Sequence, residues 1–370
     1  MSIGDPALAE FFGVDQRSSA GQRVNETTAF GLTAFYRAVS LLAGTMAALP
    51  WKSYKTNSDG ERERVSSFLD DPGAVAGLTP YAWRELVYVH LLTWGNWYGE
   101  HVRAGAGQLV GLRPWHPSRV TVEVDRVSGQ KTFRAREADG TERLFDATNM
   151  LHVMALTTDG IRGMAPLAVL RNAIGAGLAG DEAAARMFEH GAMLGGLITS
   201  EEDIGPEDAA TIAADVNAKA AGRRNVGRFV FVNRALKLQP WQQTAEDAQF
   251  IESRAFQVEE IARATGLPKV LLAEDGASTW GSGIAELVRG LEKFTFRPWA
   301  ARVEAPLSTL LEGERFLEID FAGLLAPSEA EATANMLAEV AAGTMTVDEF
   351  RRIKNRPPLE APATTEEVTA

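Results

Sequence analysis

Apolar residues spaced every three or four positions mark residues 244–265 as a long helix. The apolar face of this helix consists of Ala248, Ile251, Ala255, Val258 and Ala262. At its start, Asp247 follows Thr244 by three residues, the spacing of a capping box. At its end, Gly266 favours the left-handed conformation that stops a helix, and Pro268 prevents the helix from resuming. The pattern therefore predicts a helix with both ends defined.

A second long helix is predicted from Pro166 to about residue 191. Gly175, Gly177 and Gly180 lie inside it, and each costs a helix about 1 kcal/mol relative to Ala. Two interpretations stay open. Either this is a core helix that breaks or kinks at its glycines, or a neighbour packs closely against a face of small residues. Helices crowded around a shared axis would have such a face.

The segment 193–243 joins the two helices and is predicted as a small α/β insertion. Its strand-like runs are 195–199, 228–232 and 236–240, and residues 206–221 form its helix. Its basic group reverses the sign of an otherwise acidic chain and consists of Arg223, Arg224, Arg228, Arg234 and Lys237. This group is either a solvated turn or a docking surface for an acidic partner or for DNA phosphates.

Residues 30–163 combine helical and strand-like periods, so an α+β domain is predicted there. An N-terminal arm at 1–29 precedes it and is expected to be poorly ordered unless a neighbour holds it. The expected elements are a helix at 30–50, a strand at 51–55, a helix starting at Thr79 and Pro80, and an antiparallel meander of short strands over 93–154.

The C-terminal part begins with a polar, glycine-punctuated loop at 274–283. A long helix is predicted over 284–310, with kinks at Pro298 and Pro306 because each proline removes a backbone hydrogen bond. The remaining elements are a strand at 316–321, a helical hairpin formed by 328–342 and 347–355 around Gly343, and a tail rich in Pro, Thr and Glu from 357.

The composition limits what such a chain can do. With 370 residues, 45% of them hydrophobic, it can bury a core and form about two domains. It has no cysteine, which excludes disulfides and cysteine-ligated metals and favours a reducing compartment. Its longest apolar-leaning run, 38–51, is too short to span a bilayer, so no membrane partner is expected. A net charge of −12 disfavours tight DNA binding and is compatible with a surface that DNA slides past.

Motifs of catalysis and cofactor binding are not found, and no phosphate-binding loop is present. Gly105 and Gly107 lie between two predicted strands, where a hairpin turn explains them better than a dinucleotide loop does. Ser128 and Lys131 have the spacing of a Ser-x-x-Lys nucleophile, but that chemistry needs a helix and these residues form a turn. The five histidines are scattered, with no two at metal-ligand spacing. We therefore expect no catalytic residue, cofactor or metal. A hydrolase that assembles carboxylates from distant segments is the enzymatic alternative.

Eight runs of residues, taken together and in order, resemble one known family. They are AFYRAV at 34–39, LLTWGNWY at 91–98, DGIRG at 159–163, EDAQFIE at 246–252, FQVEEIAR at 256–263, STWG at 278–281, FRPW at 296–299 and RPPLE at 356–360. The chain resembles, over about residues 30–360, the portal (head-to-tail connector) proteins of tailed bacteriophages, of the type found in phages with long non-contractile tails.

This resemblance implies a structural protein rather than an enzyme. Portal subunits form a ring, usually of twelve copies, at one vertex of the capsid. Double-stranded DNA passes non-specifically through the axial channel during packaging and ejection. The implied partners are the terminase large subunit, later the head-tail adaptor, and the major capsid protein. The implied location is the virion, and the bacterial host cytoplasm during assembly.

The resemblance also divides the chain into the parts of a portal subunit. These are an arm at 1–29, an α+β wing at 30–163, stem helices at 164–192 and 244–268, a small α/β clip at 193–243, a tunnel loop region at 269–283, a kinked helix and wing-closing strand at 284–325, a small helical crown at 326–356 and a disordered tail at 357–370.

Three groups of residues are assigned through this division. The channel-facing tunnel loop would present Glu274, Asp275, Ser278, Thr279 and Trp280. The docking surface of the clip would consist of Arg223, Arg224 and Arg228, and the stem would pack through Ile251, Ala255, Val258 and Ala262. Trp280 either projects into the channel or packs under its own loop. The rival function is a capsid adaptor or scaffolding protein without a channel, which would act as a monomer or dimer.

Overall fold

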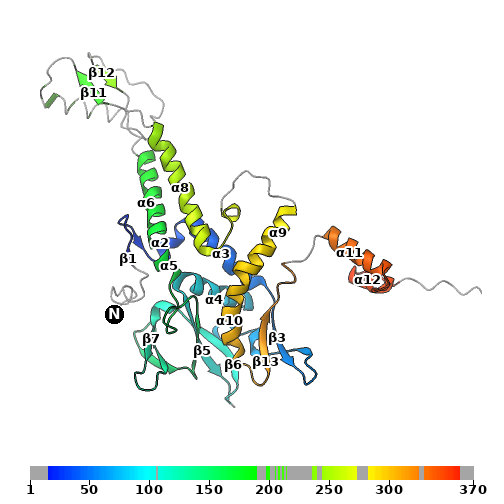
Figure 1. Cartoon of the computed structure of the whole chain (residues 1–370). Helices are drawn as coiled ribbons and strands as arrows, with labels where there is room; N and C mark the ends of the chain where they lie inside the picture. Colours follow the sequence, from blue (N-terminus) through cyan, green and yellow to red (C-terminus); the bar gives the residue numbers. More distant parts are fainter. Residues whose placement is uncertain are drawn as a thin grey trace, which may run out of the picture.

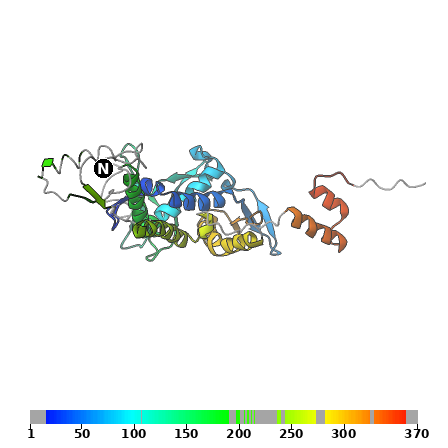
Figure 2. The same ribbon diagram turned by 90° about the horizontal axis from the view of Figure 1, so that it is seen from above.

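A computed structural model describes residues 16–105, 107–189, 197–200, 236–239, 244–272, 282–324 and 329–358, and single positions between 205 and 214. Figure 1 shows a body of helices and sheets from which two long helices project. In both views, the paired strands beyond these helices and a C-terminal helix pair lie at opposite ends of the molecule (Figures 1 and 2). Among the described helices, none combines the length and apolarity that a membrane span requires.

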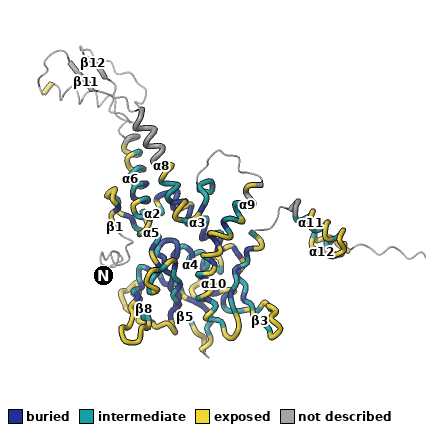
Figure 3. The backbone as a smooth tube through the Cα atoms, in the orientation of Figure 1, coloured by how far each residue is buried: buried dark blue, intermediate teal, exposed yellow. Residues whose placement is uncertain are grey.

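Two packed helices form the centre of the body. Helix α3 spans Thr33–Ala48 and helix α4 spans Pro80–Trp94, close to their expected positions. The Thr79 hydroxyl accepts a hydrogen bond from the Ala82 amide, and Gly95 ends α4 in the left-handed conformation at φ 70°. Their apolar faces are buried against each other and against the sheets, as Figure 3 shows for this region. The largest fully buried side chains on them are Phe35, Leu42, Met46, Trp83, Tyr88 and Leu91.

The body also contains three antiparallel sheets of three strands each. The first has the order β10-β5-β6, with β5 at Asn96–Arg103, β6 at Leu109–Trp115 and β10 at Met150–Met154. The second has the order β7-β8-β9, from Val120–Val124, Lys131–Arg136 and Glu142–Asp146. The third has the order β13-β3-β4, from Arg315–Ile319, Trp51–Thr56 and Arg62–Val65. Short 3-10 helices lie at Phe68–Asp70 (η1), Ala74–Ala76 (η2) and Pro117–Arg119 (η3).

The expected simple meander over 93–154 is wrong at two points: β6 and β7 lie in different sheets, and β10 does not follow β9 in its sheet. Strand β10 does not continue beside β9 but returns to pair with β5, where Val153 lies opposite Trp97. Both of these side chains are fully buried. In the order β10-β5-β6, the largely buried strand β5 is central and β10 covers its second edge, whereas β9 is largely exposed. The pairing of β10 therefore follows from burial and not from order along the chain.

Part of the expected N-terminal arm is folded onto the body. Strands β1 (Gln16–Arg17) and β2 (Arg23–Val24) form a short hairpin, and helix α2 follows at Glu26–Phe30. Val24 and Ala29 are 1% and 0% exposed and belong to the main core. Two-residue strands leave no periodic pattern, so the sequence predicts an arm where the structure has a packed hairpin.

The long C-terminal helix changes type along its length. Helix α9 (Ser282–Leu291) leads into a π-helical turn, η5 (Glu292–Phe296), and then into α10 (Arg297–Ser308). Pro298 cannot donate a backbone hydrogen bond and its ring would clash with the carbonyl four residues earlier, which favours the wider π turn immediately before it. The expected irregularity near Pro298 is therefore a π turn.

The last elements match their expected positions. Strand β13 pairs with β3 and so places the expected strand near 316 in the sheet of the body. Helices α11 (Glu329–Ala341) and α12 (Val347–Ile353) form the expected hairpin, with Gly343 at φ 75° in its turn. The Thr346 and Glu349 side chains make a capping box at the start of α12.

Candidate functional site

The two expected long helices stand side by side and project from the body (Figure 1). After the short helix α5 (Pro166–Val169), helix α6 spans Arg171–Glu189, and helix α8 spans Thr244–Thr265. At the far end, strands β11 (Leu197–Ser200) and β12 (Leu236–Gln239) pair in antiparallel fashion. We call α6 and α8 the paired helices. The break in the first of them falls at Leu170, before the glycines.

The glycines of α6 allow the N-terminal hairpin to approach the helix. A Cβ atom on Gly175 would lie 2.1 Å from Ser18 Oγ, and one on Gly177 would lie 2.9 Å from a Leu32 methyl group. Nearby, the Ser19 amide donates to Asn172 Oδ1 at 3.1 Å. Of the two interpretations of these glycines, close packing against a neighbour is therefore confirmed for Gly175 and Gly177, and the neighbour belongs to the same chain.

Polar contacts join the paired helices to each other and to the hairpin. Arg254 of α8 and Asp181 of α6 form an ion pair at 2.6 Å, and Gln22 Nε2 donates to Glu182 Oε2 at 2.7 Å. The side chains of Arg254 and Asp181 are 51% and 40% exposed, so this ion pair contributes at most about 1 kcal/mol. The helices are thus aligned by weak surface contacts and are held mainly at their bases.

The predicted apolar face of α8 is buried only where the helix meets the body. Ala262 is 6% exposed and Val258 packs against the main core, whereas Ala255 is exposed. The side chain of Ile251 lies outside the described residues. Ile261 is completely buried, although the expected face did not include it. The face changes along the helix because α8 leaves the core towards its N-terminal end.

Hydrogen bonds hold the C-terminal end of α8 and the turn that follows it against other elements of the body. Gly266 ends α8 at φ 70°, and its carbonyl accepts a hydrogen bond from Thr295 Oγ1 of the π turn at 2.7 Å. After the 3-10 turn η4 (Lys269–Leu271), the Leu271 carbonyl accepts a hydrogen bond from Arg37 Nε of α3 at 3.3 Å. The chain therefore enters residues 273–281 from an anchored turn and leaves them into α9, which runs into the same π turn.

The base of α6 is set by a close approach of two loops. Asn96 Oδ1 accepts a hydrogen bond from the Gly163 amide at 2.8 Å, and Asn96 Nδ2 donates to the Gly163 carbonyl at 2.9 Å. A Cβ atom on Gly163 would lie 1.9 Å from the Gly95 carbonyl oxygen. Two of the runs that carry the resemblance, 91–98 and 159–163, thus meet directly before α5. This contact fixes the direction in which the paired helices leave the body.

Most of the residues assigned from the sequence lie outside the described residues. They are Glu274, Asp275, Ser278, Thr279 and Trp280 of the expected tunnel loop, Arg223, Arg224 and Arg228 of the expected basic turn, and the tail from 359. The Thr295–Gly266 and Asn96–Gly163 contacts were not expected. In the sequence, Pro298 lies near Thr295, and the runs 91–98 and 159–163 contain Asn96 and Gly163. The two residues of each contact are far apart along the chain, so no local pattern predicts the contact.

Among the described residues, no three His, Asp or Glu side chains are grouped so that they could hold a metal ion. Burial, together with the adjacent His116, lowers the pKa of His90 to about 3. Burial also raises the pKa of Glu26, but hydrogen bonds from His116 and Trp94 outweigh it, so the pKa of Glu26 is lowered overall. These groups form a packed polar cluster that ties α2 to α4.

A family model described as "Phage portal protein" matches residues 33–355. The chain belongs to the phage portal protein family. It is 29% identical to the "Probable portal protein" of Streptomyces phage phiC31, over 96% of this chain and 80% of that protein. It is 26% identical to the "Portal protein" of Enterobacteria phage HK97, over 91% of this chain and 81% of that protein.

A solved structure shares the fold of this portal family member. It is titled "Neck of native GTA particle computed with C12 symmetry" and matches with a TM-score of 0.61 at 23% identity, over 97% of this chain and all of that chain. The α+β portal-type fold and the portal role expected from the sequence are thus confirmed. The paired helices, with their anchored bases, are the candidate functional site of this portal subunit.

Proposed function

We propose that this chain forms a ring-shaped channel at one vertex of a capsid, through which double-stranded DNA is packaged and later ejected. The chain supplies geometry and performs no bond chemistry. DNA passes non-specifically, and the net charge of −12 keeps phosphates from adhering. The ring is assigned to the portal vertex of the virion and forms in the cytoplasm of the bacterial host.

The observation that carries this proposal is the geometry of the paired helices. They project together from a folded body, and their bases are fixed by the Asn96–Gly163 and Thr295–Gly266 contacts. Copies related by rotation would place these helices around a common axis, as the stem of a ring. A twelve-fold ring is supported by the C12 symmetry stated for the related neck structure.

The remaining parts receive their roles through the portal family. Residues 193–243 would form the clip, which meets the terminase large subunit during packaging and the head-tail adaptor afterwards. Residues 269–283 would form the channel-facing tunnel loop. Residues 30–163, closed by β13, would form the wing towards the major capsid protein, and α11 with α12 a small crown.

The experiment that tests this proposal is the mass and shape of the purified protein. Twelve copies of 40.0 kDa give 480 kDa, so light scattering should report about half a megadalton. Negative-stain images should show rings with a central hole. A protein that stays at 40 kDa, even with capsid protein present, would contradict the channel and favour a capsid adaptor or scaffolding protein.

A further inference from the structure

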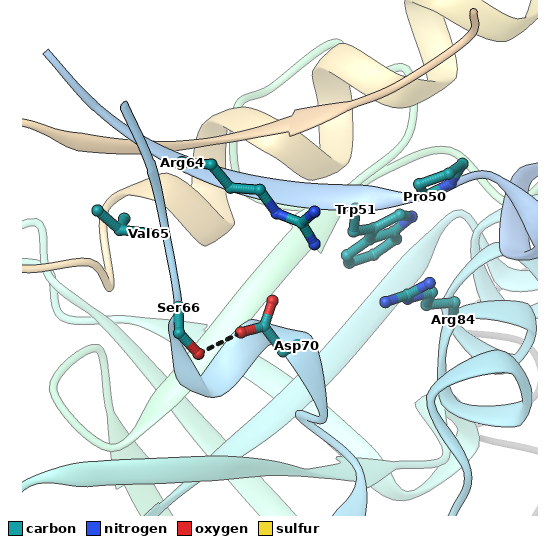
Figure 4. A pocket seen from close by; sticks show the side chains of 7 residues that line it. All are labelled: Pro50, Trp51, Arg64, Val65, Ser66, Asp70 and Arg84. Carbon is teal, nitrogen blue, oxygen red and sulfur yellow. Dashed lines mark hydrogen bonds between the residues drawn. The ribbon is translucent and has the colours of Figure 1, made fainter. Parts of the chain in front are cut away.

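A hollow of about 590 Å³ opens on the surface of the body. The residues that line it lie far from the paired helices along the sequence. It lies between the β3–β4 hairpin, the turn η1 and helix α4. Figure 4 shows two guanidinium groups and one carboxylate that face this hollow, with an indole ring at its back. Its lining consists of Pro50, Trp51, Arg64, Val65, Ser66, Asp70 and Arg84.

Arg84 is half-buried and forms no ion pair with a residue that the structure describes. Its guanidinium stacks on the Trp51 ring at 5.2 Å, and its Nη1 reaches the Leu49 carbonyl only at 3.5 Å, the outer limit of a hydrogen bond. Its Nε is buried and has no hydrogen-bond partner. Within the described residues, no carboxylate lies at ion-pair distance from it. Burial lowers the pKa of Arg84, and the charges of Asp70 and Asp71 offset this only in part.

Arg64 is the second cation that lines the hollow. The difference from its neighbour Arg62 is clear, because Arg62 Nη1 pairs with Glu318 at 2.8 Å. Arg64 has no ion-pair partner among the residues that the structure describes, and its side chain reaches over β3 towards the hollow (Figure 4). Strand β4 therefore carries Arg62, which is paired with a carboxylate, and Arg64, which is available to a ligand.

Asp70 does not neutralise these two cations. Its Oδ2 accepts hydrogen bonds from Ser66 Oγ at 2.7 Å and from the Ser67 amide at 3.0 Å, which caps the turn η1. Asp71 acts on Arg84 from outside the lining of the hollow, and the side chains that line it, two arginines and one aspartate, carry a net charge of +1. That charge matches one carboxylate better than a doubly charged phosphate, and a guanidinium binds a planar carboxylate with two parallel hydrogen bonds.

We infer that this hollow binds a carboxylate, and that the carboxylate is an Asp or Glu side chain of a neighbouring copy of this chain. The inference rests on the proposed ring, in which each subunit presents one face to a different face of the next. The chain has 49 acidic and 37 basic residues, so its surface offers carboxylates in excess. Acidic subunits that repel one another need such local pairs of opposite charge at their contacts.

Ring stability upon dilution tests the two arginines. Arg64→Gln and Arg84→Gln should each raise the subunit concentration at which rings dissociate by on the order of tenfold. Arg62→Gln is the matched control on the same strand and should change it much less. Asp70→Asn keeps the capping oxygen and removes the opposing charge, so it should stabilise the ring. Arg64 is exposed, so its variant tests the inference even if Arg84→Gln fails to fold.

A single thiol tests whether the hollow is covered. The chain has no cysteine, so Ser66→Cys places a unique maleimide target at the rim, and Ser128→Cys gives a comparison in an exposed turn. Assembly should slow labelling of Cys at position 66 by about tenfold or more relative to the unassembled protein. Fast labelling in the ring, or protection of unassembled protein by inorganic phosphate, would overturn the inference. Absence of any wild-type ring would instead contradict the proposed function.

Discussion

At the scale of single residues, two buried histidine side chains make the stability of the fold depend on pH. Burial, together with the adjacent His116, lowers the pKa of His90 to about 3. Burial, together with the charges of Lys131 and Arg162, likewise lowers the pKa of His152 to about 3. Both side chains therefore stay neutral in the folded protein at pH values where a histidine in the unfolded chain takes up a proton.

The unfolding free energy should therefore fall as the pH decreases below about 6.5. The unfolded chain binds more protons than the folded protein between pH 6.5 and 3, so acid favours unfolding, by up to about 1.4 kcal/mol per pH unit for each histidine. Urea unfolding at pH 7, 6 and 5 measures this slope. His90→Gln should reduce the slope relative to wild type, whatever its effect at pH 7. An identical slope in both proteins would show that His90 is not protected from protonation.

At the scale of secondary-structure elements, local signals allow the helices to be predicted. Thr79 with Pro80 and Gly266 with Pro268 lie at the ends where the structure has them. The sheet order depends instead on burial of β10 against β5, which no local period contains. The sequence predicted only a kink near Pro298, where the structure has a π turn. A kinked α-helix and a π turn are both compatible with a proline inside an apolar helical pattern, so the sequence does not distinguish them.

The candidate site shows the same division. The paired helices follow from apolar spacing, but the contacts that hold their bases join residues far apart, such as Asn96 with Gly163 and Thr295 with Gly266. The hollow at Arg84 is also invisible to a linear pattern, since its arginines come from a strand and a helix. The glycines of α6 left two interpretations open, because a sequence shows small residues but not what packs on them.

The packing of the N-terminal hairpin on α6 gives a prediction at this scale. Gly175→Ala gains helix propensity but places a methyl group 2.1 Å from Ser18 Oγ, so it should destabilise the protein by about 1–3 kcal/mol. Gly290→Ala in α9 is the control, because a Cβ atom there meets nothing within 4 Å, and it should stabilise by up to about 1 kcal/mol. Urea unfolding compares them. Equal stabilisation by both substitutions would mean that the hairpin does not contact α6.

At the scale of the whole molecule, the α11–α12 hairpin stands apart from the body (Figures 1 and 2). No described side chain of either helix belongs to the main core or to the smaller core between the sheets. Leu337, Val347 and Ile353 are instead 52%, 44% and 60% exposed. Apolar side chains that find no cover in their own subunit are expected at contacts between subunits.

Truncation after Leu324 should therefore separate folding from assembly. The unfolding free energy of the body should change by less than about 0.5 kcal/mol, because no described side chain of the two helices joins the core of the body. The ring should dissociate at a higher subunit concentration if the exposed apolar side chains of α11 and α12 contact the neighbouring subunit in the proposed ring. Unfolding in urea and light scattering on dilution measure the two effects. Full-length Leu337→Ser with Val347→Ser is the matched variant and should weaken the ring in the same direction. A truncated protein whose body unfolds more easily would place the hairpin in the subunit core, and an unchanged ring would exclude it from the subunit contacts.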